Sequence, residues 1–576
     1  MDNNENSPVA PDEIKQEFAE ESAPEAPAFE SAEPEQTATI INEEKPKKSK
    51  APLIVIIIAL IIIAGGVVAF FLLKDQLFGT KQKNDSGENK TSTELSKLTM
   101  KDNSLSDFDL SLLKLNNKEE NKIYSPLSIK YALKMLSDGA NGETKKEIDN
   151  LLGQYKVKAY LNNKNRSLAN VLFVQNDQKN NILNSYINGL QTNYAASVVY
   201  DDFTSAKNVN KWVSDKTLGI ISDIINDDDI AGLDFALINA LAIDMEWTSH
   251  IQCAGGGQNS KYNDNWYMVE YSHEKYSHFI DCIFDGNSFE TAKFDDGKKD
   301  VKVARIGASI NNYDIVKELG EKKIRETVKP KYEKYIKENG SNEEYLPADA
   351  DKYLDGFIEV LNSNYGQAEG STEFQMYTDD DVKVFAKDLK TYDGTTLQYV
   401  GIMPKTKKLT DYVKNTDASK LSETIGKVYD IKKENFKQGV VTKVVGTIPF
   451  FNYNYSLDLI DNLKELGVQK VFNSKEADLS KLTKVSGTAI TEVKHKADID
   501  FSNDGIKAAA VTIGGGVGNA MLFDYQFEVP VEEIDMSFDK PYMYIIRDKQ
   551  AGEVWFTGTV YTPSKTINVK QIPLAE

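Results

Sequence analysis

The stretch SPLSIKYALKMLSDGANGETKKEIDNLLG, residues 125–153, predicts two helices joined by a turn that contains glycine. Ser125 or Pro126 begins the first helix, since proline is tolerated in the first helical turn and disfavoured further inside. Just upstream, residues 106–115 (SDFDLSLLKL) have the apolar spacing of another helix. This part of the chain is therefore predicted to be mainly helical.

Strand-like segments become frequent further along the chain. They are rich in Val, Ile, Leu and aromatic side chains, as strands are, and they cover residues 168–176, 235–247, 397–405, 529–538, 542–548 and 552–561. An amphipathic helix is expected at 455–467, YSLDLIDNLKELG. Helices mainly in the N-terminal part and strands in the C-terminal part predict an α+β fold.

Charge is unevenly distributed over the 576 residues. Residues 1–44 carry thirteen Asp and Glu side chains against one lysine, Lys15, and the whole chain has a net charge of −20. This part has too little apolar surface to offset the entropy of ordering, so residues 1–50 are predicted to be a disordered acidic segment. The acidic balance also excludes nucleic acid as the expected partner, because phosphate binding needs clustered Lys and Arg.

An uncharged apolar run at residues 51–73 predicts one transmembrane helix, since a bilayer needs roughly 20 such residues. A cleavable signal peptide would be shorter and would start nearer the N-terminus. Lysines are slightly more numerous before the run than after it, which favours a cytoplasmic N-terminus and an extracellular C-terminal part. We expect a single-pass plasma-membrane protein with a flexible stalk at 74–100 and a large domain at 101–576.

Residues 250–370 are rich in Tyr, Asn, Asp, Glu and Lys, and are predicted to be an insertion or subdomain of that domain. They contain two His–Cys pairs, His250 with Cys253 and His278 with Cys282. Such a set is a candidate zinc site, because tetrahedral zinc accepts two Cys and two His ligands. A disulfide between the two cysteines suits an extracellular domain equally well, and two free thiols are the third alternative.

Six segments of the chain carry a family resemblance. They are NKIYSPLSIKYALKMLSDGANGETKKEI (121–148), VNKWVSDKTLGIISDII (209–225), INALAIDMEW (238–247), TIPFFNYNYSLDLIDNLKELGVQKVF (447–472), KHKADIDFSNDGIKAAAV (494–511) and FDKPYMYIIRDKQAGEVWFTGTVYTP (538–563). In this order they resemble the serpins, a family of suicide protease inhibitors, from about Leu105 to Pro563. The resemblance lapses between Trp247 and about Ser371. It implies a large mixed central β-sheet and an exposed reactive loop near the C-terminus.

The resemblance also implies an irreversible mechanism, in which a protease cleaves the loop and the loop then inserts into the central sheet as a new strand. The implied hinge residues are Gly505, Ile506, Ala508, Ala509, Ala510 and Thr512. Alternate residues from Ile506 to Thr512 are uncharged and share one face, as insertion into a packed sheet requires. Ile506 departs from the family pattern, where a small residue such as threonine is usual.

Family spacing from the hinge places the bait bond between Asn519 and Ala520. The loop is longer than the family pattern, so there are three neighbouring candidates, Met521, Leu522 and Phe523. The loop contains no Arg or Lys beyond Lys507. A trypsin-like target, whose pocket needs a cation, is therefore disfavoured, and elastase-, subtilisin- or chymotrypsin-like proteases are the expected partners.

Four polar residues match the shutter, a cluster beneath the central sheet of this family: Ser125, Ser128, Asn239 and His495. Because buried polar side chains need partners, such a network is expected to hold two strands together until the loop arrives. Trp247 matches the tryptophan near the point where the loop enters. No nucleophile motif surrounds the histidines, so we expect neither an enzyme nor a cofactor.

The sequence therefore predicts a monomeric, membrane-anchored serpin that traps a serine protease, or a cysteine protease, at the cell surface. The alternative is a non-inhibitory serpin that acts as a surface binding or adhesion module through the 250–370 insertion. A covalent complex with a protease would distinguish the two hypotheses.

Overall fold

The structure is a computed structural model. It describes residues 98–248, 266–268, 290–342, 346–362, 370–502, 505–506, 523 and 525–564. All of them belong to one compact unit, Gly87–Glu576. The predicted acidic segment and the predicted transmembrane helix at 51–73 lie outside this part of the chain. Among the helices that are described, none is long and apolar enough to cross a membrane.

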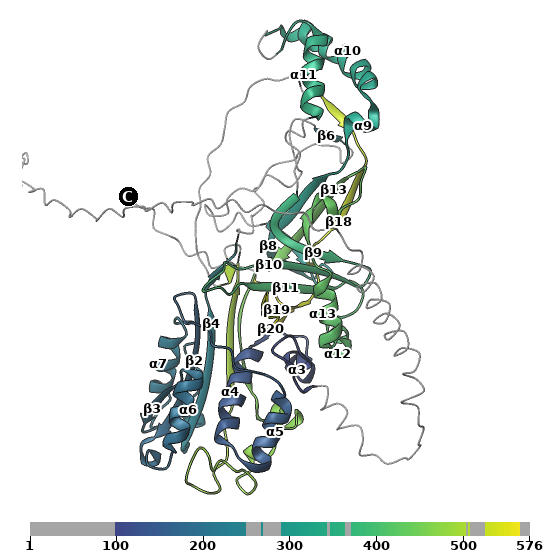
Figure 1. The fold of residues 1–576 in the computed structure, drawn as a ribbon. Coiled ribbons are helices and arrows are strands. Elements are labelled where there is room, and N and C mark those ends of the chain that lie inside the picture. Colours follow the sequence, from purple (N-terminus) through teal and green to yellow (C-terminus); the bar gives the residue numbers. More distant parts are fainter. Residues whose placement is uncertain are drawn as a thin grey trace, which may run out of the picture. The chain divides into compact units, whose positions relative to one another are not determined.

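The main hydrophobic core lies around a seven-stranded sheet with the strand order β1-β20-β19-β11-β10-β9-β12 (Figure 1). Its strands are β1 (Lys122–Tyr124), β9 (Gly370–Thr378), β10 (Val382–Asp388), β11 (Leu397–Pro404), β12 (Tyr429–Lys432), β19 (Tyr542–Asp548) and β20 (Val554–Val560). Nearly every residue of β11, β19 and β20 is buried. Burial on both faces explains why these strands are continuous apolar runs without alternation.

A four-stranded sheet has the order β18-β13-β8-β7. Its strands are β7 (Glu290–Phe294), β8 (Lys299–Asn311), β13 (Val441–Pro449) and β18 (Val531–Asp535). β18 runs parallel to β13, and the other pairs are antiparallel. Part of the 250–370 range thus forms a regular sheet with β13 and β18. A further pair of short strands, β6 (Trp266–Met268) and β17 (Gln526–Glu528), is antiparallel.

The remaining strands form a sheet in two parts. One part is β3-β2-β4 and the other is β14-β15-β16-β5. Their bounds are β2 (Arg166–Gln175), β3 (Ser197–Asp201), β4 (Phe235–Ile243), β5 (Met245–Glu246), β14 (Phe451–Asp458), β15 (Lys494–Phe501) and β16 (Gly505–Ile506). β4 and β5 are separated by Asp244 alone, so the two parts are joined at that end.

In the described part of the chain, six helices come before β4: α3 (Asp107–Leu115), α4 (Pro126–Gly139), α5 (Gly142–Leu152), α6 (Asn184–Tyr194), α7 (Lys207–Lys216) and α8 (Asp227–Ile230). α4 begins as the sequence predicts, with Pro126 in its first turn and the Ser125 hydroxyl accepting a hydrogen bond from the Ser128 N–H. It packs against α5, β4 and β20. The helix therefore lies under the two-part sheet and beside the seven-stranded one.

A second group of helices follows β8: α9 (Ile315–Leu319), α10 (Glu321–Asn339) and α11 (Ala350–Asn362). Their buried apolar side chains belong to a hydrophobic cluster separate from the main core, and we call these three helices the helical subdomain. Later in the described residues come α12 (Leu409–Asn415), α13 (Ala418–Gly426) and α14 (Ile460–Glu465). The sequence predicts helices mainly in the N-terminal part, and the structure adds the helical subdomain and α12 to α14 further along the chain.

The helix predicted at 455–467 begins later than expected. β14 extends to Asp458, and α14 covers Ile460–Glu465 only. In β14 every second residue from Asn452 is exposed, while Phe451 is buried and the tyrosines between are partly buried. The apolar residues fit a period of two as well as a helical period, and pairing with β15 decides between them.

Candidate functional site

The site is the opening between the two parts of the split sheet. β4 pairs with β2, and β15 pairs with β14, but within the described residues no backbone ladder joins β4 to β15. β16 closes the opening at one end only. Ile506 lies opposite Phe501 of β15 and Met245 of β5, and Gly505 lies opposite Glu246. The first two of the predicted hinge residues, Gly505 and Ile506, therefore form a short strand of this sheet.

Ile506, the departure from the family pattern, is buried with 2% of its surface exposed. Beside it, the Ser502 N–H and hydroxyl both donate to the Gly505 carbonyl at 3.1 Å. The bulky side chain is thus accommodated at the end of the sheet, where it belongs to the main hydrophobic cluster.

Trp247 lies at the same end of the opening and is fully buried. Its indole N–H donates to the Ser502 carbonyl at 2.9 Å. Its ring packs edge-on against Phe501 and Tyr399, at centroid distances of 5.4 and 6.1 Å. A hydrogen bond from this rigid ring holds the Ser502 carbonyl in position at the end of β15.

The four residues predicted as a shutter are buried and lie together (Ser125, Ser128, Asn239 and His495). The Ser125 N–H donates to Nε2 of His495 at 3.0 Å. The Ser128 hydroxyl donates to the side-chain oxygen of Asn239. Because Asn239 belongs to β4, His495 to β15 and both serines to the start of α4, the helix end connects the two sides of the opening.

The network continues beyond the four residues that the sequence predicts. The Asn239 amide donates to the Asn170 side-chain oxygen on β2, and the Asn170 amide donates to the Tyr194 carbonyl at 2.9 Å. Asn170 is 5% exposed. A buried asparagine directly opposite Asn239 in register is the signal that would have revealed it, but only once the pairing of β2 with β4 is known.

Burial lowers the pKa of His495 from 6.5 to about 4, because the charged imidazolium would lose its hydration. At neutral pH the ring is therefore uncharged. Since Nε2 accepts a hydrogen bond from Ser125, the ring proton is on Nδ1. Protonation of Nε2 would remove that acceptor.

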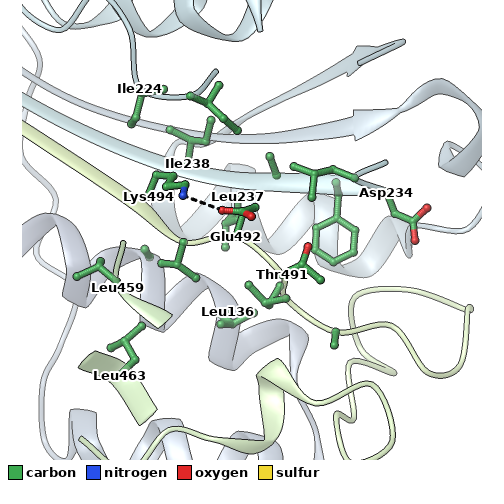
Figure 2. A pocket seen from close by; sticks show the side chains of 18 of the residues that line it. Leu136, Ile224, Asp234, Leu237, Ile238, Leu459, Leu463, Thr491, Glu492 and Lys494 are labelled. Carbon is green, nitrogen blue, oxygen red and sulfur yellow. Dashed lines mark ion pairs between the residues drawn. The ribbon is translucent and has the colours of Figure 1, made fainter. Parts of the chain in front are cut away.

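Further along the same opening lies a cavity of about 160 Å³ (Figure 2). Its walls come from α4, from the start of β4 and from residues 488–494, which lead into β15. Leu136, Leu237 and Ile238 are among the residues that line it, and the ion pair between Lys494 and Glu492 lies at its side. Most of the lining is apolar.

Lys494 marks the point where this cavity meets the outer face of the sheet. Its ammonium group lies 3.0 Å from Asp458, 3.1 Å from Glu492 and 3.4 Å from Asp229. Burial alone would lower the pKa of Lys494, but these carboxylates raise it. Lys494 therefore stays charged and ties the segment after α7 to β15.

Several predicted site residues fall outside the described part of the chain. They are the loop residues Ala508, Ala509, Ala510, Thr512, Asn519, Ala520, Met521 and Leu522, and the insertion residues His250, Cys253, His278 and Cys282. The zinc and disulfide hypotheses stay predictions. In the described ranges, no group of His, Cys, Asp and Glu side chains is arranged to hold a metal ion.

The serpin family model, described as serine protease inhibitor, matches residues 103–254 and 369–563. The chain therefore belongs to the serpin family. Its members are in general inhibitors of proteases and not enzymes.

Two relatives and one solved structure illustrate the distance within the family. An uncharacterized serpin-like protein of Methanosarcina acetivorans is 24% identical over 474 residues, which cover 79% of this chain and 84% of that protein. Neuroserpin of Mus musculus is 24% identical over 477 residues, covering 79% and 89%. The native crystal structure of the thermophilic serpin tengpin matches with a TM-score of 0.50 at 19% identity, over 84% of this chain and 97% of that one. At this identity the structural match shows the fold alone.

Proposed function

We propose that this protein is an irreversible suicide-substrate inhibitor of serine proteases, with cysteine proteases as a second target class. The observation that carries the proposal is the position of Gly505–Ile506, paired with β15 on one side and β5 on the other. Beyond this strand, no described strand pairs β4 with β15. A strand that has begun in such an opening can extend one residue at a time, adding backbone hydrogen bonds to both neighbours.

The register of β16 predicts where each later loop residue would lie. Ile506 is opposite Phe501 and Met245, so the residue six positions further, Thr512, would lie opposite His495 and Asn239. Insertion would thus bring a hydroxyl between the two shutter residues that border the opening. A hydroxyl can both donate and accept, so it is able to replace hydrogen bonds that the entry of the strand disrupts.

The side chains of the loop suit the inward face of the sheet. Ile506 points into the core, so alternation places Ala508, Ala510 and Thr512 on the same side. None of them would bury a charge. The next inward positions are all glycine, namely Gly514, Gly516 and Gly518.

These glycines favour a second candidate function. By register they would lie along the cavity of about 160 Å³, where glycine supplies no side chain to fill it. The last part of insertion would then bury little apolar surface. A non-inhibitory serpin that binds a partner through its insertion is therefore the alternative to be tested.

The expected target remains an elastase-, subtilisin- or chymotrypsin-like protease, because the loop has no Arg or Lys after Lys507. Burial disfavours Phe523 among the candidates for the bait bond. Its side chain is 6% exposed, and a protease binds the residue before the cleaved bond in its own specificity pocket. Asn519–Ala520 stays the proposed bond, with Met521 and Leu522 as neighbours.

We place the inhibitor at the outer face of the plasma membrane, as a monomer. This proposal rests on the apolar run at 51–73 and on the lysines around it. The 74–100 segment would then separate the serpin domain from the bilayer.

The test is to mix the full chain, kept in a mild detergent, with one elastase-, one subtilisin-, one chymotrypsin- and one papain-like protease. A denaturing gel should show a band heavier than either partner for at least one of them. Mass spectrometry of the C-terminal fragment would locate the cleaved bond. Cleavage by every protease without such a band would contradict inhibition. The non-inhibitory binding role would then be the function that this fold supports.

A further inference from the structure

The helical subdomain lies in the range that the family model skips, 255–368. It does not close its hydrophobic cluster by itself. The cluster also contains buried side chains from outside the subdomain, namely Val441, Phe523, Phe527 and Val529. Three of these four belong to the chain that leaves the reactive loop, Phe523 with residues 525–529, which we call the exit segment.

Phe523 is held by a cage of tyrosines from α10 and α11. Its ring centroid lies 5.1 Å from Tyr332, 5.3 Å from Tyr335 and 5.8 Å from Tyr353, in edge-to-face geometry. Tyr332 is itself stacked on Tyr353 at 3.9 Å, and its hydroxyl donates to the Pro347 carbonyl at 2.8 Å. The cage is therefore also held together by contacts that do not involve Phe523.

The rest of the exit segment follows the same helices. Phe527 stacks on Phe357 at 6.2 Å, and the Lys331 ammonium lies 4.7 Å from the ring of Tyr525. Buried aromatic pairs of this kind contribute beyond their buried area, and a cation over a ring adds to them.

The subdomain is itself attached to the serpin body. The Gly439 N–H donates to the Asn312 carbonyl at 2.9 Å, just before α9, and the Val441 N–H donates to the Pro530 carbonyl at 2.9 Å, at the end of the exit segment. Ion pairs of 2.6 Å, Arg325–Asp355 and Lys329–Asp351, join α10 to α11. The cage thus has a defined place relative to β13 and β18.

We infer that the helical subdomain is a dock for the C-terminal side of the reactive loop, with Phe523 as the residue that selects the bait bond. The dock leaves Gly505–Ile506 and Phe523 as the two held ends. Since a protease needs an extended, accessible chain around the bond it cuts, cleavage is confined to bonds on the N-terminal side of Phe523. After cleavage the new amino terminus stays attached through the exit segment while the other side inserts. This inference rests on the proposed function.

The longer loop and the helical insertion, which both depart from the family pattern, thereby explain each other. Without the dock, the added residues of the loop would be accessible and would have no contact to hold them. Each residue of extended chain adds about 3.3 Å. A longer accessible loop lets a protease cut further along the chain. The protease would then not be pressed against the inhibitor after insertion and would stay undistorted. The dock removes those residues from the accessible length.

The test compares the wild-type chain with Phe523→Ala and with Glu528→Ala, an exposed residue of the same segment. The first readout is hydrogen exchange in the uncleaved full chain. Phe523→Ala should accelerate exchange in residues 525–529 and in α10 by roughly tenfold, because the local opening costs less. Glu528→Ala should leave both unchanged. Unchanged exchange in Phe523→Ala would overturn the dock, whatever the protein does to proteases.

The second readout is the position of the cut. The wild-type chain should give one C-terminal fragment that starts before Phe523. Phe523→Ala should add fragments that start beyond it. Each residue released from the cage adds about 3.3 Å to the accessible loop. More molecules of this variant should therefore be cut without trapping the protease, so the inhibitor consumed per trapped protease should rise by roughly threefold or more.

The two proposals fail in different ways. A single unchanged cut in Phe523→Ala would overturn bond selection by the dock. If the wild-type chain traps no protease, the proposed function fails, whereas hydrogen exchange and the position of simple cleavage still decide whether the dock exists.

Discussion

The two ends of the reactive loop are held by different kinds of contact. At the hinge, Gly505–Ile506 is held by backbone pairing to β15 and β5. At the exit, Phe523 is held by the rings of three tyrosines on two helices. Backbone pairing can extend along the sheet one residue at a time. A side chain packed in a cage makes one contact, which is either present or lost. Under the proposed function, the hinge end would therefore move on cleavage and the exit end would stay in place.

The largest effect should follow from blocking the end that moves. Ala510→Asp places a carboxylate at an inward position, where burial of an unpaired charge costs several kcal/mol or more. The covalent complex should disappear and the variant should behave as a plain substrate. The matched control is Ala509→Asp, whose side chain would point to the outer face and should leave the complex intact on a denaturing gel. Equal loss in both variants would show that the register is wrong.

The second effect concerns His495 in the shutter. Folding holds the pKa of His495 at about 4, below its usual 6.5. Between these values the unfolded chain binds more protons, so the free energy of unfolding rises with pH. It should fall by about 3 kcal/mol as the pH drops from 6.5 to 4.

Urea unfolding of the wild-type chain and of His495→Asn at several pH values measures this difference. The variant lacks the titrating ring, so its stability should change less over the same window. The other histidines and the carboxylates are common to both proteins and cancel in the comparison. Parallel pH profiles would show that His495 is not the group responsible.

A smaller effect on local stability is expected at Ser502, which precedes the hinge. Trp247→Phe removes the indole N–H that donates to Ser502 at 2.9 Å while keeping a ring against Phe501. A lost hydrogen bond of this kind costs about 1 kcal/mol. Hydrogen exchange at Gly505–Ile506 should accelerate, and exchange in the exit segment should not. Trp212→Phe on α7 is the control, because that ring packs on Phe173.

The smallest effect tests the outer face of the inserted strand. By register Lys507 would lie opposite Asp500 and Asp244. Lys507→Glu would replace opposite charges by like charges, at a cost of about 0.2–1 kcal/mol per pair. The cleaved, inserted form should melt slightly earlier, and the uncleaved form should melt unchanged. A shift of both forms would place Lys507 elsewhere.

The hinge end could largely be predicted from the sequence, and the exit end could not. The shutter residues, Trp247 and Gly505–Ile506 belong to segments that resemble the family, so their proximity follows from a known fold. The contact of Phe523 with Tyr332 joins two segments 191 positions apart, both of which depart from the family pattern. Neither segment shows by composition that it has a partner. The helix predicted at 455–467 was wrong in its first half for a related reason, since pairing with β15 decided it.

The most direct test of this account is hydrogen exchange of the full chain before and after the loop is cut by a protease of the panel. We predict that β4 and β15 gain protection on cleavage, because a new strand pairs with both. Residues 526–528 should keep the protection they had, because Phe523 remains in its cage. If β4 and β15 of the cut chain gain no protection from exchange, the hinge end does not insert. If residues 526–528 lose their protection, the exit end is not fixed. Either result would contradict the proposed difference between the two ends.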